Sequence, residues 1–235
     1  MTQKPLMLQV RNLRKTFTLH GRGGVQLPVF NDISFEVSAG ECVALIGSSG
    51  SGKSTLLRSL YANYLPSAGE ILVKHHGEWV DIASVEARTK LEIRRETIGY
   101  VSQFLRVIPR ISSIDLISEV AIAGGMSSEI AIEVSSALLR RLNLPEHLWN
   151  VPPATFSGGE QQRVNIAMGL VRPYPILLLD EPTASLDASN RESAIELILE
   201  AKSRGAAIIA ICHDETARDR FADRLFDVSQ FKAAA

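Results

Sequence analysis

Gly47-Ser-Ser-Gly-Ser-Gly-Lys53-Ser54 is the stretch that decides the fold of this 235-residue chain. It fits the spacing G-x-x-x-x-G-K-[ST], in which a glycine-rich turn wraps around the phosphates of a nucleotide. Glycines allow a tight turn whose backbone N–H groups point inward, and Lys53 brings a positive charge to the outer phosphates. Ser54 offers a hydroxyl to Mg²⁺. An apolar run at 41–46 and a helical pattern at 55–61 flank the loop, so a strand, a phosphate-binding loop and a helix are predicted in succession.

The bulk composition limits the functional classes. The formal net charge is −1 and 46% of the residues are hydrophobic, so the charge balance gives no reason to predict nucleic-acid binding. The longest apolar runs are too short to span a bilayer, and the N-terminus lacks the apolar core of a signal peptide. Cys42 and Cys212 lie in expected buried strands, which suits core packing in a reducing compartment better than a disulfide. The sequence therefore predicts a cytoplasmic protein that meets a membrane only through another chain.

The order of the expected elements predicts an α/β architecture. Strands that alternate with helices favour a mainly parallel sheet covered on both faces. Between 104 and 165 the strand patterns stop and helical spacing takes over. We expect one domain over 1–235: an α/β core with an N-terminal antiparallel β subdomain from 1–103 and 166–235, and a helical lobe inserted at 104–165. Strand patterns occur at 8–17, 29–37, 69–73, 79–82, 98–102, 176–180, 206–212 and 225–228, helical patterns at 130–142 and 189–203, and a turn at 20–24.

Ile176-Leu-Leu-Leu-Asp180-Glu181 is the second motif. Its four apolar residues predict a buried central strand whose carboxyl end presents two acids, at the edge where open α/β sheets bind ligands. Asp180 is the expected partner of Mg²⁺, through the water shell of the ion, because Mg²⁺ prefers carboxylates and retains several waters. Glu181 is then placed to polarise a water that attacks the γ-phosphate.

Phe156-Ser-Gly-Gly-Glu160 opens a further helix. Ser157 and Glu160 fit a capping box. Two consecutive glycines disfavour a helix start on their own, and they are explained if a phosphate held by another molecule approaches bare N–H groups. Together with the two motifs above, this combination resembles the ATP-binding-cassette (ABC) ATPases over nearly the whole chain. Phe156 and Glu160 stand where that family more often has Leu and Gln, but Ser157 and both glycines are intact.

The resemblance implies roles for single residues elsewhere in the chain. Gln103 would link Mg²⁺ and the attacking water to the helical lobe, and His213 would lie near the γ-phosphate. Phe17 falls where the family has an aromatic ring that stacks on adenine, although Phe30 is a competitor. ATP and Mg²⁺ are the implied cofactors.

The resemblance also implies a dimer. Two chains would pack head to tail, with each ATP between the loop of one chain and residues 157–159 of the other, and hydrolysis would release the pair. Asp187 lies in a segment that resembles the loop crossing the interface. The implied catalytic residues are Gln103, Glu181 and His213; the implied metal-binding residues are Ser54, Gln103 and Asp180; the implied nucleotide contacts are Phe17, Gly47, Ser48, Ser49, Gly50, Ser51, Gly52, Lys53, Ser54, Thr55, Ser157, Gly158, Gly159 and Asp187.

The identity of the partner rests on a closer resemblance. Tyr100-Val-Ser-Gln-Phe-Leu-Arg-Val-Ile-Pro-Arg110, with Trp79-Val-Asp-Ile82 and Arg172-Pro-Tyr-Pro175, resembles the ABC proteins of the bacterial carbon–phosphorus lyase system. This implies soluble lyase core subunits and a second ABC protein as partners, and support for forming ribose 1-methylphosphonate 5-triphosphate from ATP and a phosphonate. The alternative is a nucleotide-binding subunit of a membrane transporter, of the lipoprotein-releasing or macrolide-exporter type. A scaffold that binds ATP without hydrolysing it is a third possibility, against which Glu181 and His213 argue.

Overall fold

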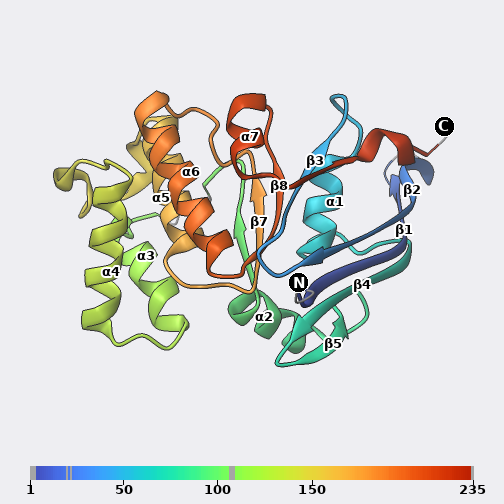
Figure 1. Ribbon diagram of the computed structural model, residues 1–235, viewed down its shortest axis with the longest axis horizontal. Coiled ribbons are helices and arrows are strands. Elements are labelled where there is room, and N and C mark those ends of the chain that lie inside the picture. Colours follow the sequence, from blue (N-terminus) through green and yellow to red (C-terminus); the bar gives the residue numbers. More distant parts are fainter. Residues whose placement is uncertain (1–3, 20, 22, 106–108, 234–235) are drawn as a thin grey trace.

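Helix α1 (Lys53–Leu60) lies between two β-sheets, and helices α3, α4, α5 and α6 lie on the far side of the second sheet (Figure 1). The structure is a computed structural model that describes residues 4–19, 21, 23–105 and 109–233. Parts of the predicted turn at 20–24 and of the run at 100–110 therefore lie outside the described residues.

The first sheet is antiparallel and has the strand order β2-β1-β4-β5. Side chains alternate along β4, where Ile71, Val73 and His75 are buried and their neighbours are more exposed, so this sheet packs on the core with one face. The predicted N-terminal antiparallel sheet, including the pairing of 69–73 with 79–82, is confirmed. Its strands are β1 (Leu6–Leu19), β2 (Val25–Ser38), β4 (Ala68–His75) and β5 (Glu78–Asp81).

The second sheet is parallel throughout and has the order β6-β7-β8-β3-β9. Every residue of β7 and β8 is buried, as expected for continuous apolar runs in a sheet covered on both faces. The predicted parallel sheet is confirmed. Its strands are β3 (Cys42–Ile46), β6 (Ile98–Val101), β7 (Ile176–Asp180), β8 (Ala207–Ile211) and β9 (Arg224–Asp227).

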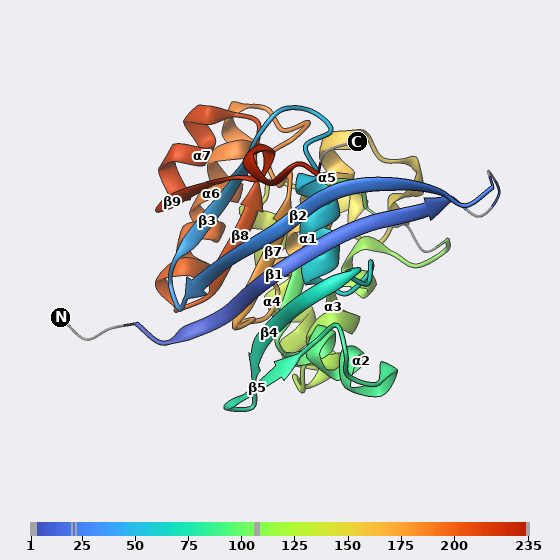
Figure 2. The ribbon, with the colours of Figure 1, turned by 90° about the vertical axis from the view of Figure 1, so that its right-hand side faces the viewer.

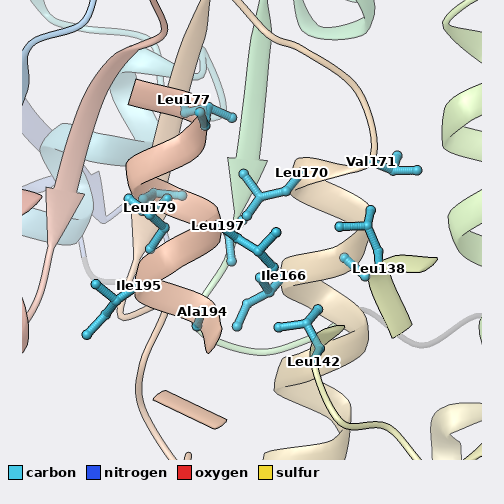
Figure 3. Packing of buried hydrophobic residues seen from close by; sticks show 14 of the residues in the cluster. Leu138, Leu142, Ile166, Leu170, Val171, Leu177, Leu179, Ala194, Ile195 and Leu197 are labelled. Atoms are coloured by element: carbon cyan, nitrogen blue, oxygen red, sulfur yellow. The ribbon is translucent and has the colours of Figure 1, made fainter. Parts of the chain in front are cut away.

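Strand β7 joins the two hydrophobic clusters of the molecule. Ile176 and Leu178 pack in the cluster that contains α1 and the antiparallel sheet. Leu177 and Leu179 belong to the other cluster, which Figure 3 shows between β7, α5 and α6. Because alternate residues of a strand point to opposite faces, β7 is packed on both faces. This packing holds the end of the strand, where Asp180 and Glu181 lie.

Helices α3 and α4 begin at polar caps that the sequence supplies. Ser112 accepts a hydrogen bond from the backbone N–H of Asp115, and Ser127 accepts one from that of Ile130. The helical patterns at 130–142 and 189–203 are confirmed, whereas α2, α3 and α7 were not predicted as individual helices. The predicted end of the helical lobe at 165 falls inside α5. The division of the chain into a core and a helical lobe stays a prediction. The remaining helices are α2 (Ala87–Glu96), α3 (Ser113–Ala123), α4 (Ser128–Arg141), α5 (Gly158–Leu170), α6 (Ala188–Ser203) and α7 (Glu215–Phe221).

Within the described residues, each helix is too short or too polar to cross a membrane. The two cysteines, Cys42 in β3 and Cys212 directly after β8, are buried and are not joined in a disulfide. Burial raises the pKa of the Cys42 thiol to about 12, so this side chain acts as a small apolar group in the core.

Candidate active site

The glycine-rich loop connects β3 to α1 and has a backbone that glycine permits. Gly47, Gly50 and Gly52 have φ values of 135°, 74° and 101°. At Gly52, which caps α1, a Cβ atom would lie 2.9 Å from Val29 Cγ1, so no side chain fits there without a shift. No side chain caps the first turn of α1. Its N–H groups are therefore available to a phosphate, as predicted for this loop.

Lys53 is folded back over the loop. Its Nζ donates to the carbonyl oxygens of Gly47 at 2.7 Å and Ser48 at 3.0 Å, and the residue is only 8% exposed. The buried hydroxyl of Ser51 has no hydrogen-bond partner in the described part of the chain. A buried cation beside an unsatisfied hydroxyl and uncapped helix N–H groups fits a polyanionic ligand.

Asp180 ends β7 and is almost completely buried, at 1% exposure. Tyr100 Oη donates to its Oδ2 at 3.4 Å, while Oδ1 has no hydrogen-bond partner among the described residues. Burial raises the pKa of the Asp180 carboxyl, and Arg58, Tyr100 and the Ser54 hydroxyl oppose that rise. A buried carboxylate with one unsatisfied oxygen beside a serine hydroxyl fits Mg²⁺, which takes hard oxygen ligands.

Glu181 follows Asp180 and has the left-handed backbone conformation, with φ 57°. Its backbone N–H donates to Ile211 O at 2.9 Å, which fixes this conformation against β8. The carboxylate Oε1 lies 2.9 Å from His213 Nε2, and the backbone N–H of His213 reaches Oε2 at 3.4 Å. Within the described part of the chain, Oε1 has no hydrogen-bond partner, so this oxygen can still accept a hydrogen bond. Burial raises the pKa of Glu181 and His213 opposes that rise.

A pocket of about 390 Å³ is lined by most of these groups, although Gly47, Ser48 and Asp180 are not among its described lining residues. The structure thus brings the predicted loop together with Gln103, Glu181 and His213, which come from four separate parts of the chain. A larger hollow of about 880 Å³, around Lys74 and Trp79 on the antiparallel sheet, holds none of them. The lining of the smaller pocket is Val29, Ser49, Gly50, Ser51, Gly52, Lys53, Ser54, Thr55, Gln103, Glu181, Ile211 and His213.

The start of α5 lies elsewhere. Ser157 and Glu160 form the predicted capping box: the backbone N–H of Ser157 donates to Glu160 Oε2 at 2.8 Å, and Ser157 Oγ accepts from the backbone N–H of Glu160 at 3.4 Å. The Ser157 hydroxyl also donates to Glu160 Oε2 at 2.8 Å, and this bond, with the one from the Ser157 backbone N–H, lowers the pKa of Glu160. Ser157 and Gly158 are exposed, and none of 157–159 is among the described residues that line the pocket. Figure 1 shows α5 and α1 on opposite sides of β7 and β8.

Phe17, its competitor Phe30, and Asp187 also lie outside the pocket lining as described. Phe30 is fully buried, so it has no face to offer to a base and is excluded as the competitor of Phe17. Phe17 is partly exposed, with its ring edge-on to Tyr64 and Lys15 Nζ 4.4 Å from its centroid. Asp187 is exposed and caps α6 by accepting the backbone N–H of Asn190 at 2.9 Å. The adenine and interface roles of Phe17 and Asp187 stay predictions.

Sequence reasoning missed Tyr100. It lies in β6, paired with Leu178 of β7, and its ring stacks on Tyr61 with centroids 4.9 Å apart. Burial raises the pKa of Tyr100 to about 12, so its hydroxyl keeps its proton and can donate to Asp180. Tyr100 could be placed near Asp180 only by knowing how β6 pairs with β7. The sequence does not give the register of that pairing.

Residues 30–184 match the family model described as ABC transporter. The chain belongs to the ABC transporter family. It is 35% identical over 210 residues to the lipoprotein-releasing system ATP-binding protein LolD of Shewanella oneidensis, covering 89% of this chain and 88% of LolD. It is 33% identical to the macrolide export ATP-binding/permease protein MacB of Vibrio parahaemolyticus, over 95% of this chain. The chain spans only 33% of the length of that export protein.

Solved structures of the same family share the fold. The dimeric structure of MJ0796, a bacterial ABC transporter cassette, has a TM-score of 0.84 and 27% identity, covering 95% of each chain. A dimeric post-hydrolysis state of the same cassette, bound to ADP and Pi, has a TM-score of 0.83 and 28% identity over 94% of each chain. The predicted family and fold are confirmed. The relatives named here are transporter proteins and give no support to the carbon–phosphorus lyase branch.

Proposed function

We propose that this ABC ATPase hydrolyses ATP in the pocket formed by the loop, Gln103, Glu181 and His213, and that closure of two copies completes the site. The observation that carries the proposal is the convergence of the buried Lys53 and Glu181 on one pocket, with the buried Asp180 beside the pocket residue Ser54. Mg²⁺, held by Ser54, Asp180 and Gln103, would neutralise charge on the phosphates.

Glu181 is the proposed general base. Its burial favours the protonated form, so the carboxylate accepts a proton from water more readily than an exposed one. The water oxygen bonds to the γ-phosphorus, the bond to the oxygen bridging the β- and γ-phosphates breaks, and the proton passes to Glu181. The contacts of its carboxylate with the Nε2 and backbone N–H of His213 orient the base.

Residues 157–159 are proposed to act on the ATP of a second chain. Ser157 and Gly158 are exposed, and all three residues lie outside the pocket of their own chain, as far as it is described. The MJ0796 cassette is dimeric in both solved states. A homodimer with two composite sites gives the two glycines a ligand and explains why a costly helix start is retained.

The partner is proposed to be a membrane transporter subunit of the lipoprotein-releasing or macrolide-exporter type. This is the alternative predicted from sequence, and similarity to LolD and MacB supports it better than the lyase assignment. The chain would then work at the cytoplasmic face of the membrane through that subunit.

The carbon–phosphorus lyase system is the second candidate, because the runs at 100–110, 79–82 and 172–175 favour it. Its partners would be soluble lyase subunits and a second ABC protein. Phe104, in the first of these runs, is 75% exposed and lines a hollow of about 390 Å³ together with Arg58, Tyr64 and Gln103. A partner bound there would contact Gln103 directly.

Affinity purification of the Glu181→Gln variant from its own cells, with Mg-ATP present, tests the assignment. A co-purifying polytopic membrane protein supports the transporter, and soluble phosphonate-degrading subunits support the lyase system. A deletion strain that still grows on a phosphonate as its only phosphorus source rules out an essential lyase role. The ATPase proposal itself fails if the purified chain, alone and with its captured partners, does not hydrolyse ATP.

A further inference from the structure

Three potential metal ligands converge at one end of the antiparallel sheet, outside the ATP pocket. His75 is the last residue of β4, His76 lies in the turn to β5 with φ 47°, and Glu96 is the last residue of α2. One ligand atom from each residue lies within 4.8 Å of the other two. Figures 1 and 2 both show α2 beside β4 and β5.

His75 is held in a position from which one ring nitrogen is free to bind. It takes the inward register of β4 with Ile71 and Val73 and is 8% exposed. Its Nδ1 lies 2.6 Å from Thr97 Oγ1. When Nδ1 carries the proton and donates it to this hydroxyl, Nε2 presents its lone pair, which is the usual arrangement of a metal-bound histidine.

Glu96 is oriented in the same way by its neighbour. Arg95 donates from Nη2 at 2.6 Å and from Nε at 3.2 Å to the Oε1 atom of Glu96. The other oxygen, Oε2, lies 2.9 Å from His76 Nε2. Arg95 therefore fixes one carboxylate oxygen and leaves the other in contact with His76.

A simpler account treats His75–Thr97 as a satisfied core hydrogen bond and His76–Glu96 as a surface ion pair. It explains each contact separately, but not why both pairs leave their ligand atoms facing one another. The β4–β5 turn places His76 next to His75 with ring centroids 4.0 Å apart, and each of the other two ligands has its own orienting partner.

We propose that His75, His76 and Glu96 bind one divalent transition-metal ion, with Zn²⁺ the best match. Two imidazoles and one carboxylate favour Zn²⁺, Ni²⁺ or Cu²⁺ over Mg²⁺ and Ca²⁺, which prefer all-oxygen sites. Three protein ligands leave a fourth position for water. The ion would tie the β4–β5 turn to the end of α2, next to the start of β6, and so would join the two sheets. Its expected effect is therefore on stability.

Isothermal titration calorimetry with ZnCl₂ tests the proposed metal site. The full chain is used without a histidine tag, after a chelator has removed bound metals. Millimolar MgCl₂ keeps the Asp180 site occupied. We expect one Zn²⁺ per chain and a higher midpoint of thermal unfolding when Zn²⁺ is present. His76→Ala and Glu96→Gln should each weaken binding at least tenfold, and Thr97→Val about tenfold through loss of the orienting hydroxyl. Co²⁺ provides a second probe, because its visible spectrum reports the ligands.

His147→Ala is the matched control, since His147 is exposed and lies outside the cluster. It should bind Zn²⁺ like the unmodified chain. His76 is exposed in a turn, so its replacement should leave the fold intact, which circular dichroism checks. The proposal is overturned if the unmodified chain takes up no stoichiometric Zn²⁺, or if folded His76→Ala and Glu96→Gln bind it as tightly as His147→Ala does.

Discussion

At the scale of single residues, the two acids of the site are held in surroundings that oppose their charge. Asp180 is buried with one oxygen unsatisfied, and Glu181 is buried in a left-handed backbone conformation. Both features lower the stability of the ligand-free chain, because an ionised carboxylate without partners loses its hydration. Such a cost at a site of strained geometry is typical of groups selected for chemistry and not for stability.

Asp180→Asn is therefore expected to stabilise the protein in the absence of Mg²⁺ while abolishing ATP turnover. Because the folded pKa of Asp180 is raised above its ordinary value of 3.8, folding is favoured by protonation. The contribution of Asp180 to stability is full below about pH 4 and is lost as the pH rises through the folded pKa. The variant should melt about 2–4 °C higher near pH 8, and the difference should shrink toward pH 4.

Asp187→Asn is the control for that pH series. The backbone hydrogen bond from Asn190 lowers the pKa of Asp187, so the ionised carboxylate stabilises the fold. This substitution should give no stabilisation at pH 8. An Asp180→Asn variant that melts at or below the temperature of the unmodified chain at pH 8 would contradict the argument.

Tyr100→Phe removes the hydroxyl that donates to Asp180 Oδ2 and leaves the ring stacked on Tyr61. Loss of a group that orients a metal ligand commonly costs about tenfold in metal affinity. Binding of a fluorescent ATP analogue, titrated with Mg²⁺, should need about ten times more Mg²⁺. Tyr64→Phe alters a neighbouring tyrosine whose hydroxyl contacts Arg58, and it should leave the titration unchanged. Equal Mg²⁺ requirements in both variants would exclude the positioning role.

At the scale of elements, the parts that the sequence predicts are those whose signal is local. The continuous apolar run of β7 identifies it as a central strand, and the loop before α1 is identified by its glycines and Lys53. Helix α2 was missed because, among its described residues, it buries only Ile93 and so has no apolar period. The Tyr100–Asp180 and His75–Thr97 contacts were missed because each joins separate elements, whose register and packing are set by the fold.

The first turn of α5 gives an element-scale prediction. A Cβ atom at Gly159 would lie 2.8 Å from the carbonyl oxygen of Ser185, whereas one at Gly158 would make only ordinary contacts at 3.9 Å. Gly159→Ala should therefore destabilise the chain by about 1–3 kcal/mol, through displacement of the helix start from the loop before α6. Gly158→Ala should keep the unmodified stability. Urea unfolding of the two variants compares them, and equal midpoints would refute the close approach.

At the scale of the whole molecule, the proposed composite site is divided between two places on one chain. The loop and Glu181 share a pocket, and the start of α5 lies across the parallel sheet from α1 (Figure 1). A second chain supplies the missing half in the proposed dimer, so ATP would act as the contact between protomers. The stability of the dimer would then depend on whether the γ-phosphate is intact.

Glu181→Gln is expected to accumulate as a dimer with Mg-ATP, because it loses the base but keeps the phosphate contacts. Size-exclusion chromatography with light scattering should give the mass of two chains with Mg-ATP and of one chain with Mg-ADP. The double variant Lys53→Ala/Glu181→Gln should stay monomeric, since it lacks the buried cation of the loop. A monomer at saturating Mg-ATP, with bound nucleotide demonstrated, would count against the dimer.

Because β7 lies between the two hydrophobic clusters, its position suggests how the ATPase could be regulated. A close-packed interior has low compressibility, so a shift of α5 or α6 against Leu177 and Leu179 should move β7 as a whole. Asp180 is the last residue of β7 and Glu181 follows it, so both acids would move with the strand. We therefore expect that a partner bound to α5 or α6 can alter the placement of both acids without contacting the nucleotide. We also expect tolerance to substitution to be lowest at the five residues of β7.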